Sequence, residues 1–330
     1  MAHPIAVVTG ASAGIGRATA IEFGRHGWRV ALLARGIDGL EGARRDVREA
    51  GGEAMIVVTD VADQAQVEAA AERIEREWGA IEVWVNDAMA TIFCDLASIS
   101  PADFRRATEV TYLGTVWGTM AALKRMKPRD AGAIVQVGSA LAYRSIPLQA
   151  PYCGAKSAIR GFTDALRSEL IHDNSRVQLT MVQLSAFNTP QFDWGRCCLP
   201  DVPKPLGKIF QPEVAARGIY WAATHRQREL WVGWPAAEAI IGTRFLAGYL
   251  DRKLARDAYA GQESAKPVAP GRRDNLYQPL PGDHGAHGRF DDRAHDFSSQ
   301  LWLATHPRVL AAVLAAAALM AAGLLRWAAS

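Results

Sequence analysis

Short apolar runs alternate with stretches of helical periodicity over the first 233 residues of the chain. The apolar runs are mostly continuous rather than interleaved with polar residues, which is typical of strands covered on both faces. The stretches between them repeat apolar residues every three or four positions, as helices with one buried face do. We therefore predict strands at residues 5–9, 29–34, 54–59, 81–86, 133–137, 177–184 and 230–232, and helices at residues 15–26, 37–50, 63–78, 101–126, 155–172 and 212–224.

This alternation predicts an α/β fold: a doubly wound, Rossmann-like parallel sheet of about seven strands. Parallel strands need crossover connections, and the helices between successive strands supply them. After residue 233 the pattern changes to a helical extension over residues 234–260, a linker over 261–306 and an apolar tail over 307–330. Residues 261–288 hold five glycines and four prolines in 28 positions, a composition that is typical of an irregular linker.

The apolar tail contains 17 consecutive uncharged residues, 309–325, between Arg308 and Arg326. As a helix this run would be about 26 Å long, close to the roughly 30 Å hydrocarbon core of a bilayer. Trp302 and Trp327 are placed to lie in the two interfaces. We expect a transmembrane anchor that the linker tethers, and the alternative is a helix packed on the core or between subunits.

Composition restricts the class of partner. Apolar residues make up 49% of the chain and charged residues 22%, as in ordinary globular proteins. Lys and Arg number 37 against 34 Asp and Glu, a net charge of +3 that lacks the basic excess of nucleic-acid binders. We expect no nucleic-acid partner. The first residues already predict a strand rather than a cleavable leader, which favours a cytoplasmic catalytic domain.

Neither the cysteines nor the histidines form a recognisable pattern. The four cysteines have no framework spacing and suit a reducing compartment. The adjacent Cys197 and Cys198 fit two unrelated loop cysteines better than a redox couple. His284 and His287 lack a supporting thiolate or carboxylate cluster, so no metal site is predicted.

A glycine-rich turn joins the first predicted strand to the first predicted helix. Glycines in the pattern Gly-x3-Gly-x-Gly let the backbone turn tightly and approach a pyrophosphate, whose charge the free N–H groups of the helix N-terminus stabilise. The turn therefore predicts a dinucleotide site. Its candidate residues are Gly10, Ser12, Gly14, Ile15 and Gly16.

The end of the second predicted strand bears on the choice of cofactor. An acidic residue there would bond a ribose 2′-hydroxyl and repel a 2′-phosphate, but this chain has Arg35, whose guanidinium suits a phosphate. Arg17 either helps or faces solvent. NADP(H) is therefore favoured over NAD(H), although Ala13 stands where a second basic residue would strengthen the preference.

Three polar residues follow at a spacing that suits acid–base chemistry. Ser139 ends the fifth predicted strand, and Tyr152 and Lys156 are four residues apart, so they project from one face of a helix. A free tyrosine has a pKa of about 10, and a neighbouring ammonium would lower it. This constellation predicts proton transfer to or from a substrate oxygen during hydride transfer.

Together, the glycine turn, Ser139 and Tyr152-x3-Lys156 resemble the single-domain short-chain dehydrogenase/reductase family over about residues 4–233. The resemblance implies an NADP(H)-binding catalytic domain at residues 1–233, with Ser139 on the substrate oxygen and Lys156 on the nicotinamide ribose. It also implies that Asp60, Val61, Asn86 and Thr189 contact the cofactor. The substrate pocket it implies is lined by Met89, Ala140, Leu141, Ala142, Gln149, Phe187, Phe192 and Trp194.

Three departures from the family pattern bear on turnover rate and cofactor affinity. Thr111 stands where the family has a catalytic asparagine, and its hydroxyl could hold a relay water. The family's Asn-Asn-Ala-Gly is Asn86-Asp87-Ala88-Met89 here, and Met89 places a long side chain where glycine admits the cofactor. The usual Pro-Gly after the sixth strand is missing at residues 184–186.

The favoured function is an NADP(H)-dependent oxidoreductase that interconverts a small apolar carbonyl and its alcohol. The pocket residues are mostly apolar, with no cation placed to bind a carboxylate. A non-catalytic dinucleotide-binding regulator or scaffold is the first alternative, and a nucleotide-sugar epimerase is the second. Helices 101–126 and 155–172 carry more apolar surface than one sheet face covers, which predicts a homodimer or homotetramer.

Overall fold

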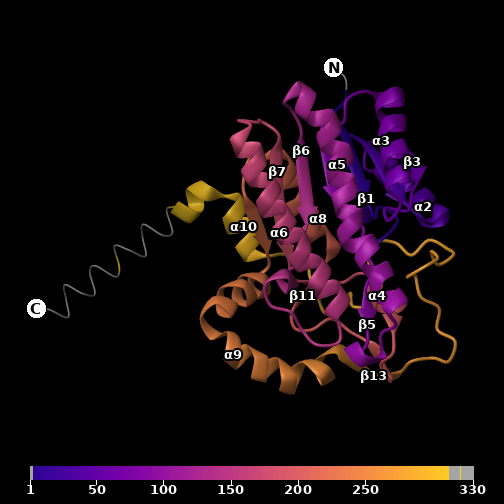
Figure 1. Ribbon diagram of the computed structural model, residues 1–330, viewed down its shortest axis with the longest axis vertical. Helices are drawn as coiled ribbons and strands as arrows, with labels where there is room; N and C mark the ends of the chain where they lie inside the picture. Colours follow the sequence, from indigo (N-terminus) through magenta and orange to yellow (C-terminus); the bar gives the residue numbers. More distant parts are fainter. Residues whose placement is uncertain (1–2, 312–319, 321–330) are drawn as a thin grey trace, which may run out of the picture.

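The computed structural model describes residues 3–311 and residue 320 (Figure 1). Within these residues the core is a seven-stranded, wholly parallel sheet in the order β12-β7-β6-β4-β1-β2-β3. The predicted fold class is confirmed. The order reverses between β1 and β4, where open α/β sheets form their binding crevice. The strands are β1 (Ile5–Thr9), β2 (Arg29–Ala34), β3 (Glu53–Val58), β4 (Val83–Asn86), β6 (Ala133–Val137), β7 (Gln178–Leu184) and β12 (Glu229–Val232).

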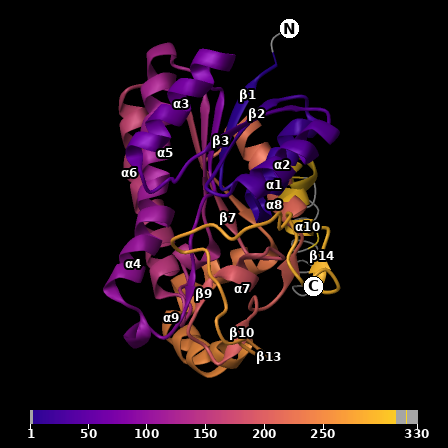
Figure 2. The same cartoon turned by 90° about the vertical axis from the view of Figure 1, so that its right-hand side faces the viewer.

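Helices cover both faces of the sheet, as Figure 2 shows edge-on. One apolar core lies beneath α1 (Gly14–Arg25), α2 (Ile37–Glu49) and α8 (Pro212–Thr224) and includes Phe23, Leu40 and Ile219. A second core lies on the opposite face and includes Ile74, Met126 and Leu166. The helices of that face are α3 (Gln64–Trp78), α4 (Pro101–Thr108), α5 (Gly114–Met126) and α6 (Ala150–His172).

Two helices differ from the sequence prediction. The helix expected at residues 101–126 is divided into α4 and α5 by a π-helical turn, Glu109–Leu113. Such turns commonly occur at functional sites. Helix α6 begins at Ala150 rather than at residue 155. Proline is favoured in the first turn of a helix, where the N–H group that it lacks would have no hydrogen-bond partner within the helix, and Pro151 takes that place. Tyr152 therefore lies in the first turn of α6.

Short elements gather beyond the carboxyl ends of the parallel strands. They form three small sheets in addition to the central one, and each ties a loop to a neighbouring part of the chain. The strands are β5 (Ile92–Phe93), β8 (Ala186–Phe187), β9 (Arg196–Cys197), β10 (Asp201–Pro203), β11 (Ile209–Phe210), β13 (Glu263–Pro267) and β14 (Ala294–His295). The helices are η1 (Leu96–Ser98), η4 (Ala140–Ala142), α7 (Gln191–Trp194) and α10 (Ser299–Thr305), whereas η3 (Lys127–Arg129) lies at the opposite end of the sheet, before β6.

The C-terminal region is built against this end of the molecule. Helix α9 (Trp234–Gln262), predicted as the helical extension, bends at Leu246, where the backbone leaves helical geometry. The region 261–306 was expected to be a slack linker, but it packs along the α/β domain. Strand β13 pairs with β10, β14 pairs with β11, and Leu276 is fully buried in one of the two cores. Main-chain pairing and burial therefore hold this glycine- and proline-rich region in place.

The predicted membrane span at residues 309–325 lies mostly outside the described residues. Among the helices that the structure does describe, none combines the length and the apolar character needed to cross a bilayer. The membrane anchor therefore stays a prediction from sequence. The argument from a loose linker does not hold, because residues 261–306 pack along the α/β domain.

Candidate active site

A cavity of about 530 Å³ lies at the carboxyl ends of the parallel strands, beside the point where the strand order reverses. It extends from the glycine turn and the end of β2 to the first turns of α6 and to α9. The structure brings most of the predicted site residues together along its walls. Those residues are Gly10, Ser12, Gly14, Ile15, Arg35, Asp60, Val61, Met89, Ser139, Ala140, Leu141, Gln149, Tyr152, Lys156, Phe187, Thr189, Phe192 and Trp194.

The glycine turn has the geometry that its sequence predicts. Gly10 has φ +74°, and a Cβ atom there would lie 2.9 Å from the Ala88 Cα atom. At Gly16 a Cβ atom would lie 2.4 Å from the Gly10 carbonyl oxygen. Side chains are therefore excluded at both positions, and the backbone comes close to the end of β4. Helix α1 begins here without a side-chain cap, and its first N–H group, that of Gly14, donates to the Gly285 carbonyl at 3.1 Å.

Ser139, Tyr152 and Lys156 meet deeper in the same cavity. Ser139 follows β6, and its Oγ accepts a 3.1 Å hydrogen bond from the Leu141 N–H. The Lys156 Nζ lies 5.6 Å from the centre of the Tyr152 ring, one helical turn away. It also donates a 2.6 Å hydrogen bond to the Val137 carbonyl. The ammonium is thereby fixed beside the phenol, in the arrangement that the spacing predicts.

Burial is the main influence on the protonation states of Tyr152, Lys156 and Asp87. Burial raises the pKa of the Tyr152 hydroxyl, and its interaction with Ser139 offsets part of that increase. Tyr152 therefore carries its proton at neutral pH and can act as an acid. Burial lowers the pKa of Lys156, whereas the carboxylate of Asp87 acts in the opposite direction. Burial in turn raises the pKa of Asp87.

Asp87 is a wall residue to which the sequence analysis gave no role. It stands where the family pattern has its second asparagine, directly after β4, and it lines the cavity with Tyr152 and Lys156. Its Oδ2 would lie 2.9 Å from a Cβ atom at Gly16. Only a side chain as small as glycine fits opposite it. The aspartate at a position where the family has asparagine was the feature of the sequence that could have indicated a role for Asp87.

Three residues predicted to bind the cofactor or to act in catalysis do not line the cavity: Gly16, Asn86 and Thr111. The Thr111 hydroxyl donates to the Ala90 carbonyl at 3.1 Å and accepts from the Ala90 N–H at 3.0 Å. The Asn86 amide donates to Thr119 at 3.1 Å and to a buried glutamine at 2.9 Å. Thr111 and Asn86 therefore hold the backbone around β4 in place from behind the cavity. Ala142, a further pocket candidate, also lies outside the lining.

The basic residues near the glycine turn already have protein partners. Arg35 donates hydrogen bonds to the main-chain carbonyls of residues 275, 276 and 277. Arg17 is buried and forms ion pairs with Asp46, at 2.7 Å, and with Asp283. Asp60, at the end of β3, accepts a 2.5 Å hydrogen bond from Arg106. Of the two arginines considered for a phosphate, only Arg35 faces the cavity.

Most of the wall residues at the substrate end are apolar, but Arg144 and Lys253 also line the cavity, so the expectation of a pocket without a cation is wrong. Phe192 lies between Phe93 and Phe290, with ring centres at 5.6 and 5.7 Å. Helix α9 contributes wall residues that the sequence analysis did not assign, because a regular helix far along the chain gives no sign of what it faces. They are Pro235, Glu238, Ala239, Leu250, Lys253 and Leu254.

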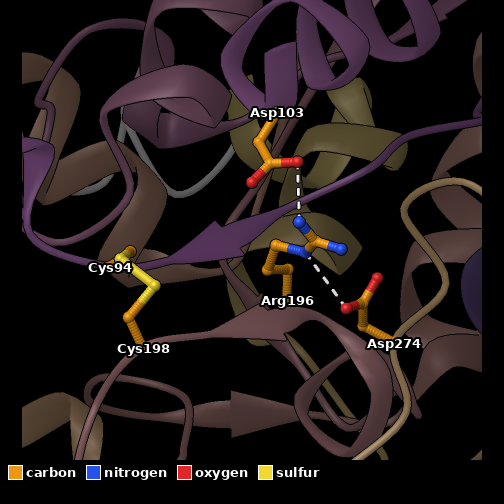
Figure 3. Close-up of a disulfide and its surroundings, with 5 residues drawn as sticks. All are labelled: Cys94, Asp103, Arg196, Cys198 and Asp274. Atoms are coloured by element: carbon orange, nitrogen blue, oxygen red, sulfur yellow. Dashed lines mark hydrogen bonds and ion pairs between the residues drawn. A yellow bond between two sulfur atoms is a disulfide. The ribbon is translucent and has the colours of Figure 1, made fainter. Parts of the chain in front are cut away.

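A disulfide between Cys94 and Cys198 ties down the segment that carries Phe192 and Trp194 (Figure 3). The cysteine spacing did not predict this pair, whereas Cys197 and Cys198 are not bonded to each other, as expected, and Cys197 is a free thiol. Arg196 reinforces the attachment, because it pairs with Asp103 at 2.6 Å and with Asp274 at 3.0 Å. The two cysteines are 104 residues apart in the sequence, so their spacing gave no signal.

The two histidines considered for a metal have other contacts. His287 bonds both Asp291 and Glu213 at 2.8 Å, and His284 packs edge-on against Trp194 with ring centres 4.8 Å apart. Across residues 3–311 and 320, no group of three or more His, Cys, Asp or Glu side chains is arranged to hold a metal ion.

Comparisons with known proteins agree with this geometry. The family model described as short chain dehydrogenase matches residues 4–193. The uncharacterized oxidoreductase YxnA of Bacillus subtilis (strain 168) is 30% identical over 331 residues, which cover 99% of this chain and 90% of YxnA. Mouse 17-beta-hydroxysteroid dehydrogenase 13 is 28% identical, with 84% of each chain covered.

Solved structures show the same likeness. An alcohol dehydrogenase from the archaeon Thermococcus sibiricus, in complex with 5-hydroxy-NADP, matches with a TM-score of 0.60 and 26% identity over 70% of this chain and 96% of that one. A variant of actinorhodin polyketide ketoreductase with NADPH matches with a TM-score of 0.61 and 27% identity over 70% and 97%. YxnA, unlike these structures, also covers the C-terminal region.

Proposed function

The chain belongs to the short-chain dehydrogenase family and is an NAD(P)-dependent oxidoreductase, and on that premise we propose that it uses NADP(H) to interconvert an apolar carbonyl compound and its alcohol. The meeting of Ser139, Tyr152 and Lys156 in one cavity with the glycine turn carries this proposal. Ser139 follows β6, whereas Tyr152 and Lys156 lie on α6, and all three line the cavity, so a substrate oxygen bound among them would accept both a hydrogen bond and a proton.

The cofactor fits the residues that are present. Gly10, Ser12, Gly14 and Ile15 line the cavity at the start of α1, where N–H groups would bind a pyrophosphate, and the Gly14 N–H now bonded to the Gly285 carbonyl would have to be shared or released. Arg35 is a cation of the cavity wall at the end of β2, which supports a preference for a 2′-phosphate. When bound, the dinucleotide supplies or accepts the hydride.

Side chains of the protein carry out the proton transfer. Ser139 donates a hydrogen bond to the substrate oxygen and stabilises the negative charge that develops there during reduction. Tyr152, protonated because of its burial, gives its proton to that oxygen. Lys156 stabilises the resulting tyrosinate with its charge. In the oxidative direction each step reverses, with Tyr152 as the base.

The wall composition supports an apolar substrate of some bulk. Helices α7 and α9 contribute mostly aromatic and aliphatic wall residues, together with the charged Glu238 and Lys253. Some relatives are named hydroxysteroid dehydrogenases, which agrees with a bulky apolar ketone or alcohol. A non-catalytic dinucleotide-binding scaffold is the second candidate, because Thr111 bonds Ala90 and so is not aimed at the cavity as a relay residue would be.

A panel of apolar and polar carbonyl compounds with NADPH and with NADH, followed by nicotinamide absorbance, tests the proposal. The expected result is turnover of apolar carbonyls with NADPH preferred. Tight binding of a dinucleotide without turnover of any compound, in either direction, would favour the scaffold instead.

Exposed apolar side chains bear on assembly and location. Met120 on α5 and Ile171 on α6 are 52% and 70% exposed, which supports pairing of these helices between subunits in a homodimer or homotetramer. Phe245 on α9 and Phe297 before α10 are 79% and 60% exposed, which supports contact of this end with an apolar phase. The location we propose is a cytoplasmic catalytic domain held at a membrane by residues 309–325.

A further inference from the structure

Residues 275–288, here called the strap, cross the carboxyl ends of β3, β2, β1 and β7 in succession. In Figure 2 this part of the orange chain runs between β13 and β14, past α2 and α7. It comes from the region that the sequence indicated as a linker. Its course along the predicted dinucleotide site distinguishes it from an ordinary surface loop.

The first part of the strap is held from inside the cavity. Arg35 donates a 2.9 Å hydrogen bond to the Tyr277 carbonyl and a 3.3 Å bond to the Leu276 carbonyl, and it also bonds the Asn275 carbonyl. Arg106 donates to the Leu276 carbonyl at 3.2 Å. Leu276 itself is fully buried. Two cations and one apolar side chain therefore fix this end.

The middle of the strap is fastened outside the cavity. Asp283 pairs with the buried Arg17 and, at 3.3 Å, with Arg45. The Gly282 N–H donates a 2.7 Å hydrogen bond to the Asp38 carboxylate on α2. Asp283 does not line the cavity, although its neighbours Gly282 and His284 do. Asp283, here called the latch, therefore holds the middle of the strap through ion pairs that lie outside the cavity.

The last part of the strap lies on the glycine turn and on the end of β7. The Gly14 N–H donates to the Gly285 carbonyl at 3.1 Å. The Gly288 N–H donates to the Asn188 carbonyl at 3.2 Å, and His287 pairs with Glu213 of α8. Both ends and the middle are therefore attached to the domain that binds the dinucleotide.

The strap covers the cavity without filling it. Asn275, Pro279, Leu280, Gly282 and His284 line the same cavity as Gly10, Arg35 and Asp60. We propose that the strap is a part of the dinucleotide site that closes over the adenosine half of the bound cofactor, and that Asp283 is the positioning residue that keeps it closed. This inference rests on the proposed use of a nicotinamide dinucleotide.

The physical reason is that a dinucleotide beneath the strap leaves only after the strap lifts. Lifting breaks the Asp283 ion pairs with Arg17 and Arg45 and uncovers the carbonyls that Arg35 holds. Arg17 keeps its pair with Asp46 when the strap lifts, but its buried guanidinium loses the second carboxylate, so the Asp283 pair favours the closed position. The cofactor is therefore retained between turnovers, and loss of the latch speeds its release.

The test compares Asp283→Asn with Asp292→Asn in the full chain. Asp292 is an exposed aspartate of the same region, so it controls for the loss of one charge. NADPH dissociation is measured by stopped-flow nicotinamide fluorescence after displacement with excess NADP⁺, and association is measured by direct mixing. We expect NADPH to leave Asp283→Asn at least tenfold faster, and association to be faster as well, because entry and exit pass the same strap. Asp292→Asn should behave as the wild type.

A second variant guards against misfolding of the first. Asp38→Ala removes the acceptor of the Gly282 N–H from the opposite side and should raise the dissociation rate in the same direction. Dissociation within twofold of wild type in both variants would overturn the strap proposal alone. Tighter NADPH binding in Asp283→Asn would also overturn it, because the strap would then compete with the cofactor for Arg35. A wild-type chain that binds neither NADPH nor NADH would overturn the proposed function as well.

Discussion

Arg35 donates a 2.9 Å hydrogen bond to the carbonyl of Tyr277, which lies 242 positions further along the chain. The guanidinium that the sequence indicates as a phosphate ligand is thus also a contact between the start and the end of the protein. Arg35 therefore links the choice of cofactor to the position of the strap.

Arg35→Asp should change the cofactor preference. The substitution removes a cation from the cavity wall and adds a charge that repels a 2′-phosphate while accepting a bond from a 2′-hydroxyl. The ratio of NADPH to NADH affinity should fall at least tenfold, which corresponds to about 1.4 kcal/mol. Fluorescence titration of both cofactors measures it. An equal loss of both affinities would assign Arg35 to holding the strap only.

Asp87→Asn should move the alkaline limb of the pH profile to lower pH. The Asp87 carboxylate raises the pKa of Lys156 against the effect of burial, so its removal lowers that pKa further. Lys156 is cationic only below its pKa, and the proposed mechanism needs the cation. Profiles of kcat/KM for carbonyl reduction at saturating NADPH show the shift. Asp95→Asn, an exposed change near the same strand, is the control, and a shift toward higher pH would contradict the argument.

Cys198→Ser should destabilise the protein more than Cys197→Ser does. The Cys94–Cys198 bond joins segments 104 residues apart, and removal of such a bond typically costs about 2–4 kcal/mol of unfolding free energy. Cys197 is a free thiol next to it and serves as the matched control. Denaturant unfolding without reductant measures the difference. Equal stabilities for the two variants would show that the bond is not formed in solution.

Sequence reasoning predicted correctly which residues lie together where short spacings determine their positions. Gly10, Gly14 and Gly16 form one turn, and Tyr152 and Lys156 are separated by one helical turn, so their proximity depends only on local structure. Alternating apolar runs and helical periods likewise predicted the seven strands.

It could not find contacts between remote segments. Arg35 bonds carbonyl oxygens, which every residue carries, so residues 275–277 give no pattern that a sequence shows. Cys94 and Cys198 meet because β5 pairs with β9, two strands of two residues each. The glycines and prolines of residues 261–288 are typical of slack chain, but here they allow a strap to follow the surface of the domain.

Removal of the apolar tail should change where the protein is found in cells. A chain that ends at His306 keeps α10 and lacks residues 309–325, so it should move from the membrane fraction to the supernatant. Fractionation without detergent, followed by release of the full chain with detergent, measures this. Recovery of both chains in the supernatant would contradict the anchor.

The assignment of Tyr152 as the acid and base is the central claim. In Tyr152→Phe the phenol hydroxyl is lost, while the ring can pack as before beside Lys156. The most direct measurement is a single-turnover assay of Tyr152→Phe, with NADPH binding followed by fluorescence and oxidation by absorbance, on a substrate that the wild type reduces. We predict NADPH affinity within threefold of wild type and a rate of hydride transfer lower by a factor of 10² or more. Turnover at the wild-type rate would contradict the account.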